Sequence, residues 1–328
     1  MPAADEDTPR TIVSRPSTGD RIFRAILRGS GWSVFVITGL ILVFLIVRAS
    51  KAFKFMGFGF LTTQTWILYD PQHFGIAAIL PLGILIALIA MLIAVPTGIA
   101  IALYISEYSP LRLRKALVAL IDLMAAIPSI IFGIWGLLFL EPRITGFDSW
   151  LGRHLGFIPF FQFRLNTSVE GYYEGSTFIA GLVVSLMVIP IVTSLSRQVF
   201  SQAPQGEREG AYALGATRWG MIRTVVLPFG RGGVIGACML GLGRALGETI
   251  AVTLIISPVF HFNFHVLETG GNSIASSIAL DFSSFPDAGS MGLSALMAAG
   301  LVLFGMTLIV NTLGAIVIGR SRYGMATG

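Results

Sequence analysis

The chain has 328 residues, of which 54% are hydrophobic and only 12% are charged. A soluble domain carries about 25% charged residues, so this composition excludes a water-soluble protein and indicates a chain that lies in lipid. The formal net charge is +5, but the basic residues are spread over short segments between apolar runs, which argues against nucleic-acid binding. The single cysteine, Cys238, excludes an internal disulfide and argues against a cysteine-based zinc site.

The N-terminal residues 1–31 are polar and basic, and they predict a cytoplasmic tail with a short surface helix near Asp20–Arg28. This polar lead is too long for a cleaved signal peptide, and no small-residue cleavage site follows the first apolar run. Trp32–Val47 is therefore expected to be an uncleaved first membrane span that extends further at both ends.

Five more apolar runs follow the first. A helix needs about 20 apolar residues to cross the hydrocarbon core, and only helices and closed barrels satisfy their backbone in lipid. Because the runs are continuous rather than alternating, they predict helices. The fold class is therefore an all-α integral membrane protein with six transmembrane helices over 32–320, followed by a C-terminal tail over 321–328. The five runs cover about 76–105, 116–140, 178–195, 233–258 and 291–318.

The distribution of Lys and Arg predicts the orientation, because these residues are enriched in cytoplasmic loops. With the N-terminus inside, 15 of the 22 Lys and Arg residues fall in inside segments and 6 in outside segments, while Arg244 lies within a span. The last outside loop, about 259–290, has neither Lys nor Arg. Both termini are therefore expected to be cytoplasmic.

Two charged residues, Arg244 and Glu248, interrupt the fifth apolar run. Each costs about 2.5–3.5 kcal/mol at mid-bilayer on insertion scales, so both must face protein or water. At 100° per residue they share one helix face, beside a stripe of glycines that would let another helix approach closely. Two interpretations stay open: a lining of a translocation path, since an Arg fork suits phosphate oxygens, or an i, i+4 ion pair that only specifies packing. The stripe consists of Gly232, Gly236, Gly243 and Gly247.

Other candidate sites carry weaker signals. Asp122, near the inner end of the third run, is expected to pair with Arg114 or Lys115 at the membrane interface. His261 and His265 have the i, i+4 spacing of zinc ligands, but the absence of a third ligand favours interfacial packing. The sequence has no phosphate-binding loop of the GxxxxGK[ST] kind, no HExxH and no nucleophile–base pair. We therefore expect no enzyme activity, no metal site and no cofactor.

The most informative inside segment lies between the fourth and fifth apolar runs. A helix over about 205–216 would end at a glycine and be followed by an apolar patch at Trp219 and Met221. Such a piece suits the groove of a cytoplasmic partner, although a loop helix on the membrane surface explains the pattern equally well. The segment resembles the E-A-A-x3-G-x9-I-x-L-P signature of bacterial ABC importer permeases, with Gly210 and Val225 replacing the usual Ala and Ile. The matching residues are Glu209, Ala211, Gly215, Leu227 and Pro228.

Further segments resemble one branch of that family, the PstC type of phosphate permease. The resemblance covers nearly the whole chain from about residue 19. The sister PstA type is similar in the second half, but the opening of the chain and its long outer loops favour the PstC type. The segments that carry the resemblance are Gly19–Arg24, Ile127–Gly136, Gly206–Gly215, Gly232–Ala237 and Leu242–Thr249.

The resemblance implies a six-span permease domain in a bacterial plasma (inner) membrane, with a coupling loop over about 197–232. It implies import of inorganic phosphate, driven by ATP hydrolysis on separate subunits that dock on Glu209–Gly215, with Arg244 and Glu248 acting in transport. The implied partners are a second, PstA-like permease, two PstB-like ATPase subunits and an extracytoplasmic PstS-like phosphate-binding protein. Import of sulfate or molybdate is the alternative. A membrane enzyme or sensor is disfavoured, because the spans hold no catalytic cluster and no long soluble output domain is present.

Overall fold

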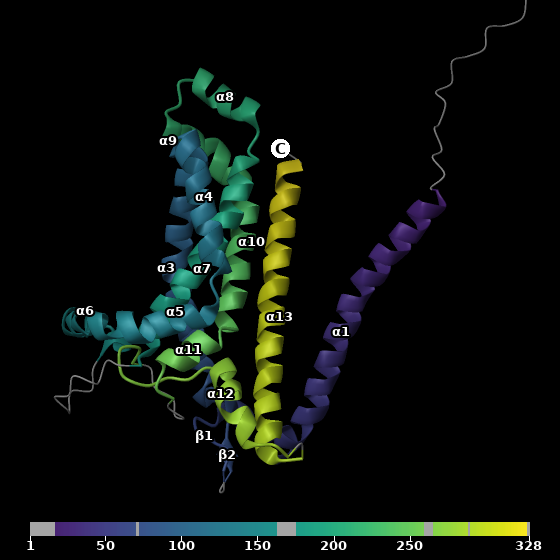
Figure 1. The fold of residues 1–328 in the computed structure, drawn as a ribbon, viewed down its shortest axis with the longest axis vertical. Helices are drawn as coiled ribbons and strands as arrows, with labels where there is room; N and C mark the ends of the chain where they lie inside the picture. The colour runs from purple at the N-terminus through teal and green to yellow at the C-terminus, as the bar shows by residue number, and fades with distance from the viewer. Residues whose placement is uncertain (1–16, 70–71, 163–174, 259–264, 288, 327–328) are drawn as a thin grey trace, which may run out of the picture.

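Long apolar helices dominate the computed structural model of the protein (Figure 1), which confirms the predicted all-α membrane fold. The structure describes residues 17–69, 72–162, 175–258, 265–287 and 289–326. The tail residues 1–16, His261 and residues 327–328 lie outside the described residues. Six described helical segments are long and apolar enough to cross a membrane: Thr18–Met56, Ile76–Tyr108, Ser129–Leu155, Thr177–Ser201, Arg218–Leu246 and Met291–Val317.

The first half of the chain forms three of these segments and a small antiparallel sheet in which Trp66 pairs with Phe74. Its helices are α1 (Thr18–Met56), α2 (Gly59–Thr62), α3 (Leu80–Leu103), α4 (Leu111–Ala126), α5 (Ser129–Trp135) and α6 (Glu141–Leu155). Its strands are β1 (Trp66–Ile67) and β2 (His73–Phe74), and its short 3-10 and π turns are η1 (Ile76–Ala78), η2 (Tyr104–Tyr108), η3 (Gly136–Leu140) and η4 (Pro159–Phe161).

The second half forms the other three long segments. Its helices are α7 (Thr177–Ser201), α8 (Gln205–Ala213), α9 (Arg218–Met221), α10 (Leu227–Leu246), α11 (Ile250–Ile255), α12 (Ile274–Asp281) and α13 (Met291–Ala326). Two short turns accompany them, η6 (Ile222–Val226) and η7 (Phe282–Ser284). Because α13 continues to Ala326, most of the expected C-terminal tail is the end of this helix.

Helix α1 includes both the expected surface helix and the expected first span in one continuous element. Ser17 caps its start, since the Ser17 Oγ accepts a hydrogen bond from the Asp20 amide at 3.2 Å. Figure 1 shows α1 leaning away from the other helices, so that it meets α13 only through its C-terminal part. Ala49 and Ala52 are the buried residues of this contact.

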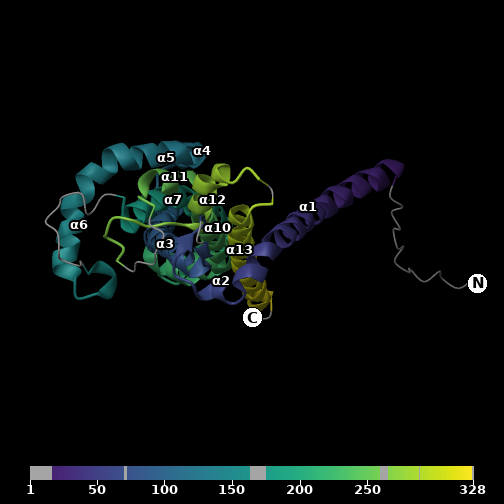
Figure 2. The same cartoon turned by 90° about the horizontal axis from the view of Figure 1, so that it is seen from below.

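The third apolar run is not one straight helix as expected over 116–140. Helix α4 ends at Ala126, and α5 begins after Pro128. Proline lacks an amide donor and holds the preceding residue, Ile127, in an extended conformation (ψ 128°), which stops the helix. Figures 1 and 2 show that α5 and α6 turn away from α4 and run across the bundle.

The packed centre consists of α3, α7 and α10. Its helices approach closely because glycines on one helix receive branched side chains from the next, the kind of contact that holds helices together in lipid. A Cβ atom added to any of three glycines would lie 2.6–2.9 Å from such a side chain: Gly98 from Val192, Gly181 from Ile89, and Gly241 from Val188.

Three of the short turns are π-helical: η2 at the end of α3, η3 between α5 and α6, and η6 between α9 and α10. Single π turns inside α-helices accommodate one extra residue and are frequent at functional sites. Two of them, η2 and η6, lie near α8. Figure 1 shows that α8, α9 and the end of α13 lie toward one end of the bundle, called the α8 end below.

Candidate functional site

The fifth span is broken at the point where its two charged residues lie. Helix α10 ends at Leu246, and Gly247 forms its C-cap. The Glu248 amide donates to the Ala245 carbonyl at 3.4 Å, and the Glu248 Oε1 accepts from the Ala251 amide at 3.4 Å, which caps the start of α11. The expected continuous helix over 233–258 is therefore two helices, and the Glu248 carboxylate satisfies one of the amides that begin the second.

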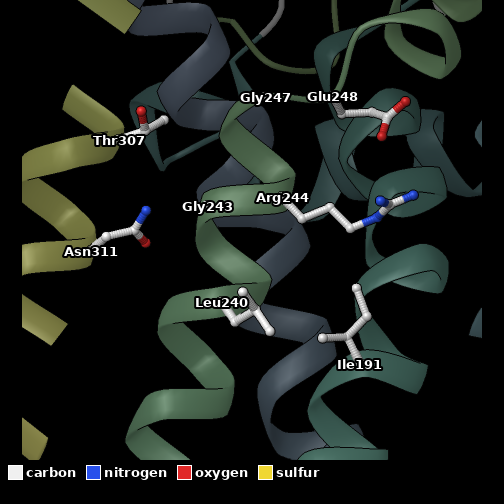
Figure 3. A pocket seen from close by; sticks show the side chains of 8 residues that line it. All are labelled: Ile191, Leu240, Gly243, Arg244, Gly247, Glu248, Thr307 and Asn311. Atoms are coloured by element: carbon white, nitrogen blue, oxygen red, sulfur yellow. The ribbon is translucent and has the colours of Figure 1, made fainter. Parts of the chain in front are cut away.

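A pocket of about 500 Å³ lies beside this break. Residues from three long helices line it (Figure 3). The lining residues are Ile191 of α7, Leu240, Gly243 and Arg244 of α10, Gly247 and Glu248 of the break, and Thr307 and Asn311 of α13. The structure thus brings the two charged residues predicted from the sequence into one pocket.

The side chains of Arg244 and Glu248 project to the same side of α10, away from α13 (Figure 3). Arg244 is exposed, whereas Glu248 is buried, with 7% of its surface accessible. No ion pair joins the two within the described part of the chain, and Arg244 has no hydrogen-bond partner there either. The ion-pair interpretation therefore does not describe this structure, because the guanidinium is left facing the pocket with all its donors available.

Helix α13 contributes two polar residues that the sequence interpretation did not select. The Thr307 hydroxyl donates to the Phe304 carbonyl at 2.9 Å, so its oxygen keeps its acceptor capacity. A Cβ added to Gly243 would lie 3.4 Å from the Asn311 Oδ1, which places the Asn311 amide against α10. The available signal was the occurrence of polar side chains inside an apolar run, where they often mark contacts between helices.

The predicted glycine stripe of α10 is divided between two environments. Gly243 and Gly247 line the pocket, whereas Gly232 is buried and Gly236 is half-buried outside it. The closest packing of α10 against α7 comes from other glycines on this helix. Gly230, Gly233 and Gly241 receive Phe200, Val199 and Val188 of α7.

Asp122 makes a different contact from the one expected, and the His261–His265 pair lies partly outside the described residues. The Asp122 Oδ1 accepts a hydrogen bond from Ser194 of α7 at 3.4 Å, while Arg114 donates to the Ser106 carbonyl. The expected pair of Asp122 with Arg114 or Lys115 is therefore wrong for the described residues, because Asp122 bonds to α7 and Arg114 bonds to η2. His265 lies 3.6 Å from the Glu268 carboxylate, and no cluster of metal-ligating residues occurs in the described ranges.

The segment that resembles the importer signature forms α8 and the start of α10. The Glu209 carboxylate accepts a hydrogen bond from Gln205 at 3.0 Å, and Ala211 packs against the cluster around Phe200. Gly215 follows α8 with φ +84°, a conformation that ends the helix and that glycine adopts without strain. Leu227 and Pro228 lie apart from α8, in the first turn of α10, where proline is favoured.

Large apolar side chains are exposed around α8, at the end of the bundle opposite α12 (Figure 1). Leu214 is 91% exposed, and Tyr212 and Trp219 are also exposed. A second, mostly apolar pocket of about 390 Å³ adjoins them, between η2 and α9. An exposed apolar surface of this kind marks a site where another protein or the membrane surface binds.

Residues 94–323 match the family model described as binding-protein-dependent transport system inner membrane component. The chain belongs to this family. Phosphate transport system permease protein PstC 2 of Mycobacterium bovis is 39% identical over 311 residues, or 94% of both chains. The PstC protein of Haemophilus influenzae is 40% identical over 297 residues, covering 88% of this chain and 90% of the relative. These identities and coverages make the chain a PstC-type permease.

A solved structure of a bacterial alginate ABC transporter has the same fold as this PstC-type permease. The likeness covers 90% of this chain and 95% of that chain, with a TM-score of 0.58 and 18% identity. The chain is therefore a multi-pass inner membrane component of an ABC transporter, and it is a non-catalytic permease subunit. Membership of this family implies ATPase and binding-protein partners.

Proposed function

We propose that this PstC-type permease imports inorganic phosphate through the pocket at the break between α10 and α11. The observation that carries the proposal is the exposed Arg244 guanidinium, which lines the pocket without a partner among the described residues. A guanidinium presents five donors in a planar fork that matches two oxygens of one phosphate. The relatives named as phosphate transport permeases support phosphate as the anion.

Glu248 gives this pocket a means of selecting phosphate over sulfate. Its carboxylate is buried beside the pocket and repels an anion that carries no proton. Phosphate near neutral pH still carries a proton, which the carboxylate can accept in a hydrogen bond, whereas sulfate carries none. Arg244 therefore attracts both anions and Glu248 disfavours only one, which is selectivity with a repulsive element.

The test uses the variant Glu248→Gln, which keeps the size of the side chain and removes its charge. Uptake of labelled phosphate and sulfate is measured in vesicles that contain the whole complex, with the binding protein matched to each anion. We expect phosphate uptake to fall and the ratio of sulfate to phosphate uptake to rise. Arg231→Gln is the matched control, because Arg231 is an exposed residue of α10 outside the pocket. An unchanged ratio in Glu248→Gln would remove Glu248 from the selection of the anion.

We further infer that α8 is the docking site for an ATPase of the PstB type. The exposed apolar residues around α8 and the family signature across α8 and α10 support this assignment. A PstA-like permease would complete the path beside α10 and α13, and a PstS-like protein would deliver phosphate at the opposite face. These partners follow from the PstC type of the chain.

An ATPase that docks at α8 requires α8 to lie in the cytoplasm, and we infer that both termini lie there as well. The excess of Arg and Lys in the segments at the α8 end supports it, and the helices α1 and α13 respectively begin and end toward that end (Figure 1). In a Cys238→Ala background, Ser284→Cys is expected to react with an impermeant thiol reagent added outside, and Glu207→Cys is expected to be protected. Both positions are exposed. The reverse labelling pattern would overturn the orientation.

A further inference from the structure

One arginine ties α8 to the membrane helices. The Arg208 Nη1 lies 2.8 Å from the Glu107 Oε2, and the Arg208 Nη2 donates to the Phe200 carbonyl at 2.6 Å. Glu107 belongs to the π turn η2 that follows α3, and Phe200 lies in the last turn of α7. A single guanidinium therefore connects three elements: α8, the end of α3 and the end of α7.

This contact is more buried than most of α8. The Glu107 side chain is 4% exposed and the Arg208 side chain is 20% exposed, whereas most of α8 faces solvent. Charge-assisted hydrogen bonds are strong where water is largely excluded, and removal of one partner leaves the other charge buried without compensation. Breaking this contact is thus expected to cost more free energy than breaking a surface ion pair, which contributes little.

Of the two helices joined by Arg208, α7 lines the Arg244 pocket and α3 packs against α7. Helices α3 and α7 are interlocked along their length by the glycine contacts described above, and α7 carries Ile191, which lines the pocket beside Arg244. The Phe200 ring also lies against Gly230 of α10, where an added Cβ would be 2.7 Å away. A displacement of α8 is therefore transmitted through closely packed contacts to the helices that line the pocket.

We propose that Arg208 is a positioning residue that makes α8 and the ends of α3 and α7 move as one rigid unit. Through this unit, movement of a docked ATPase changes the shape of the Arg244 pocket. The proposal rests on the proposed docking of an ATPase at α8, and it adds the element that carries the movement into the membrane. Glu107 is the second member of the unit, since it fixes the guanidinium against α3.

The first experiment measures coupling in proteoliposomes that contain the permease pair, the ATPase and the binding protein. The readout is the number of ATP molecules hydrolysed for each phosphate taken up. We expect Arg208→Gln and Glu107→Gln each to raise this ratio about tenfold or more while the complex still assembles. Arg231→Gln is the matched control, because Arg231 is an exposed arginine outside both α8 and the Arg244 pocket and is expected to leave the ratio unchanged. Normal ratios in both variants would overturn the proposal.

Exchanging the two charges distinguishes loss of the ion pair from a general effect of the substitutions on folding. The double variant Glu107→Arg, Arg208→Glu restores opposite charges across the contact, although it does not restore the bond to the Phe200 carbonyl. We expect it to recover part of the coupling lost in the single variants. Failure of the exchange to improve on either single variant would contradict the role of the ion pair.

A cross-link tests rigidity itself. Glu107→Cys and Arg208→Cys, in a Cys238→Ala background, are joined with a short bismaleimide. Before joining, this variant lacks the ion pair and is expected to be uncoupled. If α8 and the end of α3 move as one unit, joining them is expected to lower the number of ATP molecules hydrolysed for each phosphate, and an unchanged number would contradict the rigid unit. Loss of transport on joining would show that the two elements must separate, and would overturn the proposal.

The docking assignment is tested separately with Leu214→Cys, also in a Cys238→Ala background. This residue is the most exposed apolar side chain near α8 and has no part in the Arg208 contact. A cross-link from this position to the ATPase supports docking at α8. If that cross-link is absent while the Arg208 variants still uncouple the complex, docking at α8 fails and the rigid unit stands. If the Leu214 cross-link forms while the Arg208 variants remain coupled, the rigid-unit proposal is wrong and docking at α8 is supported.

Discussion

Helices α1 and α7 are equally apolar over their most apolar stretches, yet more than half of that stretch is buried in α7 and none of it in α1. Both contain small residues. Nothing lies within 4 Å of a Cβ added to Gly39 of α1, whereas a Cβ added to Gly181 of α7 would lie 2.6 Å from Ile89. Hydropathy therefore predicts which segments enter lipid, and the fit between glycines and branched side chains determines which of them pack together.

The difference also distinguishes the helices that one chain packs completely by itself from the helix that lipid or another subunit must cover. The centre of α3, α7 and α10 is complete within one chain, since its contacts are close and continuous. Most of α1 presents apolar side chains outward, and these are satisfied by lipid or by another subunit. Substitutions in the two regions are thus expected to differ greatly in effect.

The largest effect is expected for Gly181→Leu. The added side chain would collide with Ile89, whose branched carbon cannot move aside without separating α3 from α7, and overpacking of this kind costs about 1–3 kcal/mol or more. We expect little or no folded complex after solubilisation, measured by size-exclusion chromatography. Gly39→Leu on α1 is the matched control and is expected to leave the yield unchanged. A normal yield for Gly181→Leu would show that the centre is not closely packed.

Arg244→Gln is expected to abolish most transport without loss of folded protein. The residue is exposed to the pocket and makes no contact within the described residues that holds the bundle together. Loss of the cationic fork is expected to lower phosphate uptake about tenfold or more. Thr307 lines the same pocket, and Thr307→Val is expected to lower phosphate uptake by a smaller factor. Unchanged uptake in Arg244→Gln would place the phosphate path elsewhere.

An intermediate effect is expected for Gly215→Leu at the end of α8. A φ of +84° is strained for leucine, at a cost of about 1–2 kcal/mol, and relief of the strain would redirect the chain between α8 and α9. The permease is expected to insert normally, but transport and stimulation of ATP hydrolysis are expected to fall together. Gly206→Ala, in the first turn of α8, serves as the control because open space surrounds both positions and Gly206 lacks the positive φ of Gly215. Normal coupling in Gly215→Leu would contradict docking at α8.

The smallest effect is expected for Val36→Ala on α1. Val36 is 55% exposed, and surface substitutions of this kind change stability by less than about 0.5 kcal/mol. The thermal unfolding temperature of the purified permease pair is the measurement. A clear decrease in that temperature would sharpen the comparison, since it would show that another subunit covers this face of α1.

The sequence predicts the membrane fold because lipid permits few alternatives. Six long apolar segments follow from the need to satisfy every backbone group in the hydrocarbon core, and two charged residues in such a segment identify a site. The breaks after Ile127 and Leu246 were not predicted, because averaged hydropathy is continuous across both. Pro128 and Gly247 were the local signals. Pro128 stops α4 by its own backbone geometry, whereas the break at Gly247 is completed by the Glu248 carboxylate, which bonds the Ala251 amide.

The composition of the pocket was predicted only on its α10 side. Arg244 and Glu248 are conspicuous in sequence because charge is rare in a span. Asn311 and Thr307 are not, since either residue can bond within its own helix or face a neighbour, and only the contact between α10 and α13 decides. The partners of Gly98 and Gly241 were likewise beyond sequence analysis, because close packing joins residues that lie about a hundred or fifty positions apart.

The π turn η6 determines the direction in which the α8 surface points. Its hydrogen bonds span five residues instead of four, so Ile222–Val226 holds one residue more than an α-helix would. Each residue of an α-helix rotates the chain by about 100°. If the same five residues formed a regular α-helix, the extra residue would rotate Trp219, together with α8, about the axis of α10 by that angle. The winding of this single turn thus sets the orientation of the whole α8 surface and leaves the composition of that surface unchanged.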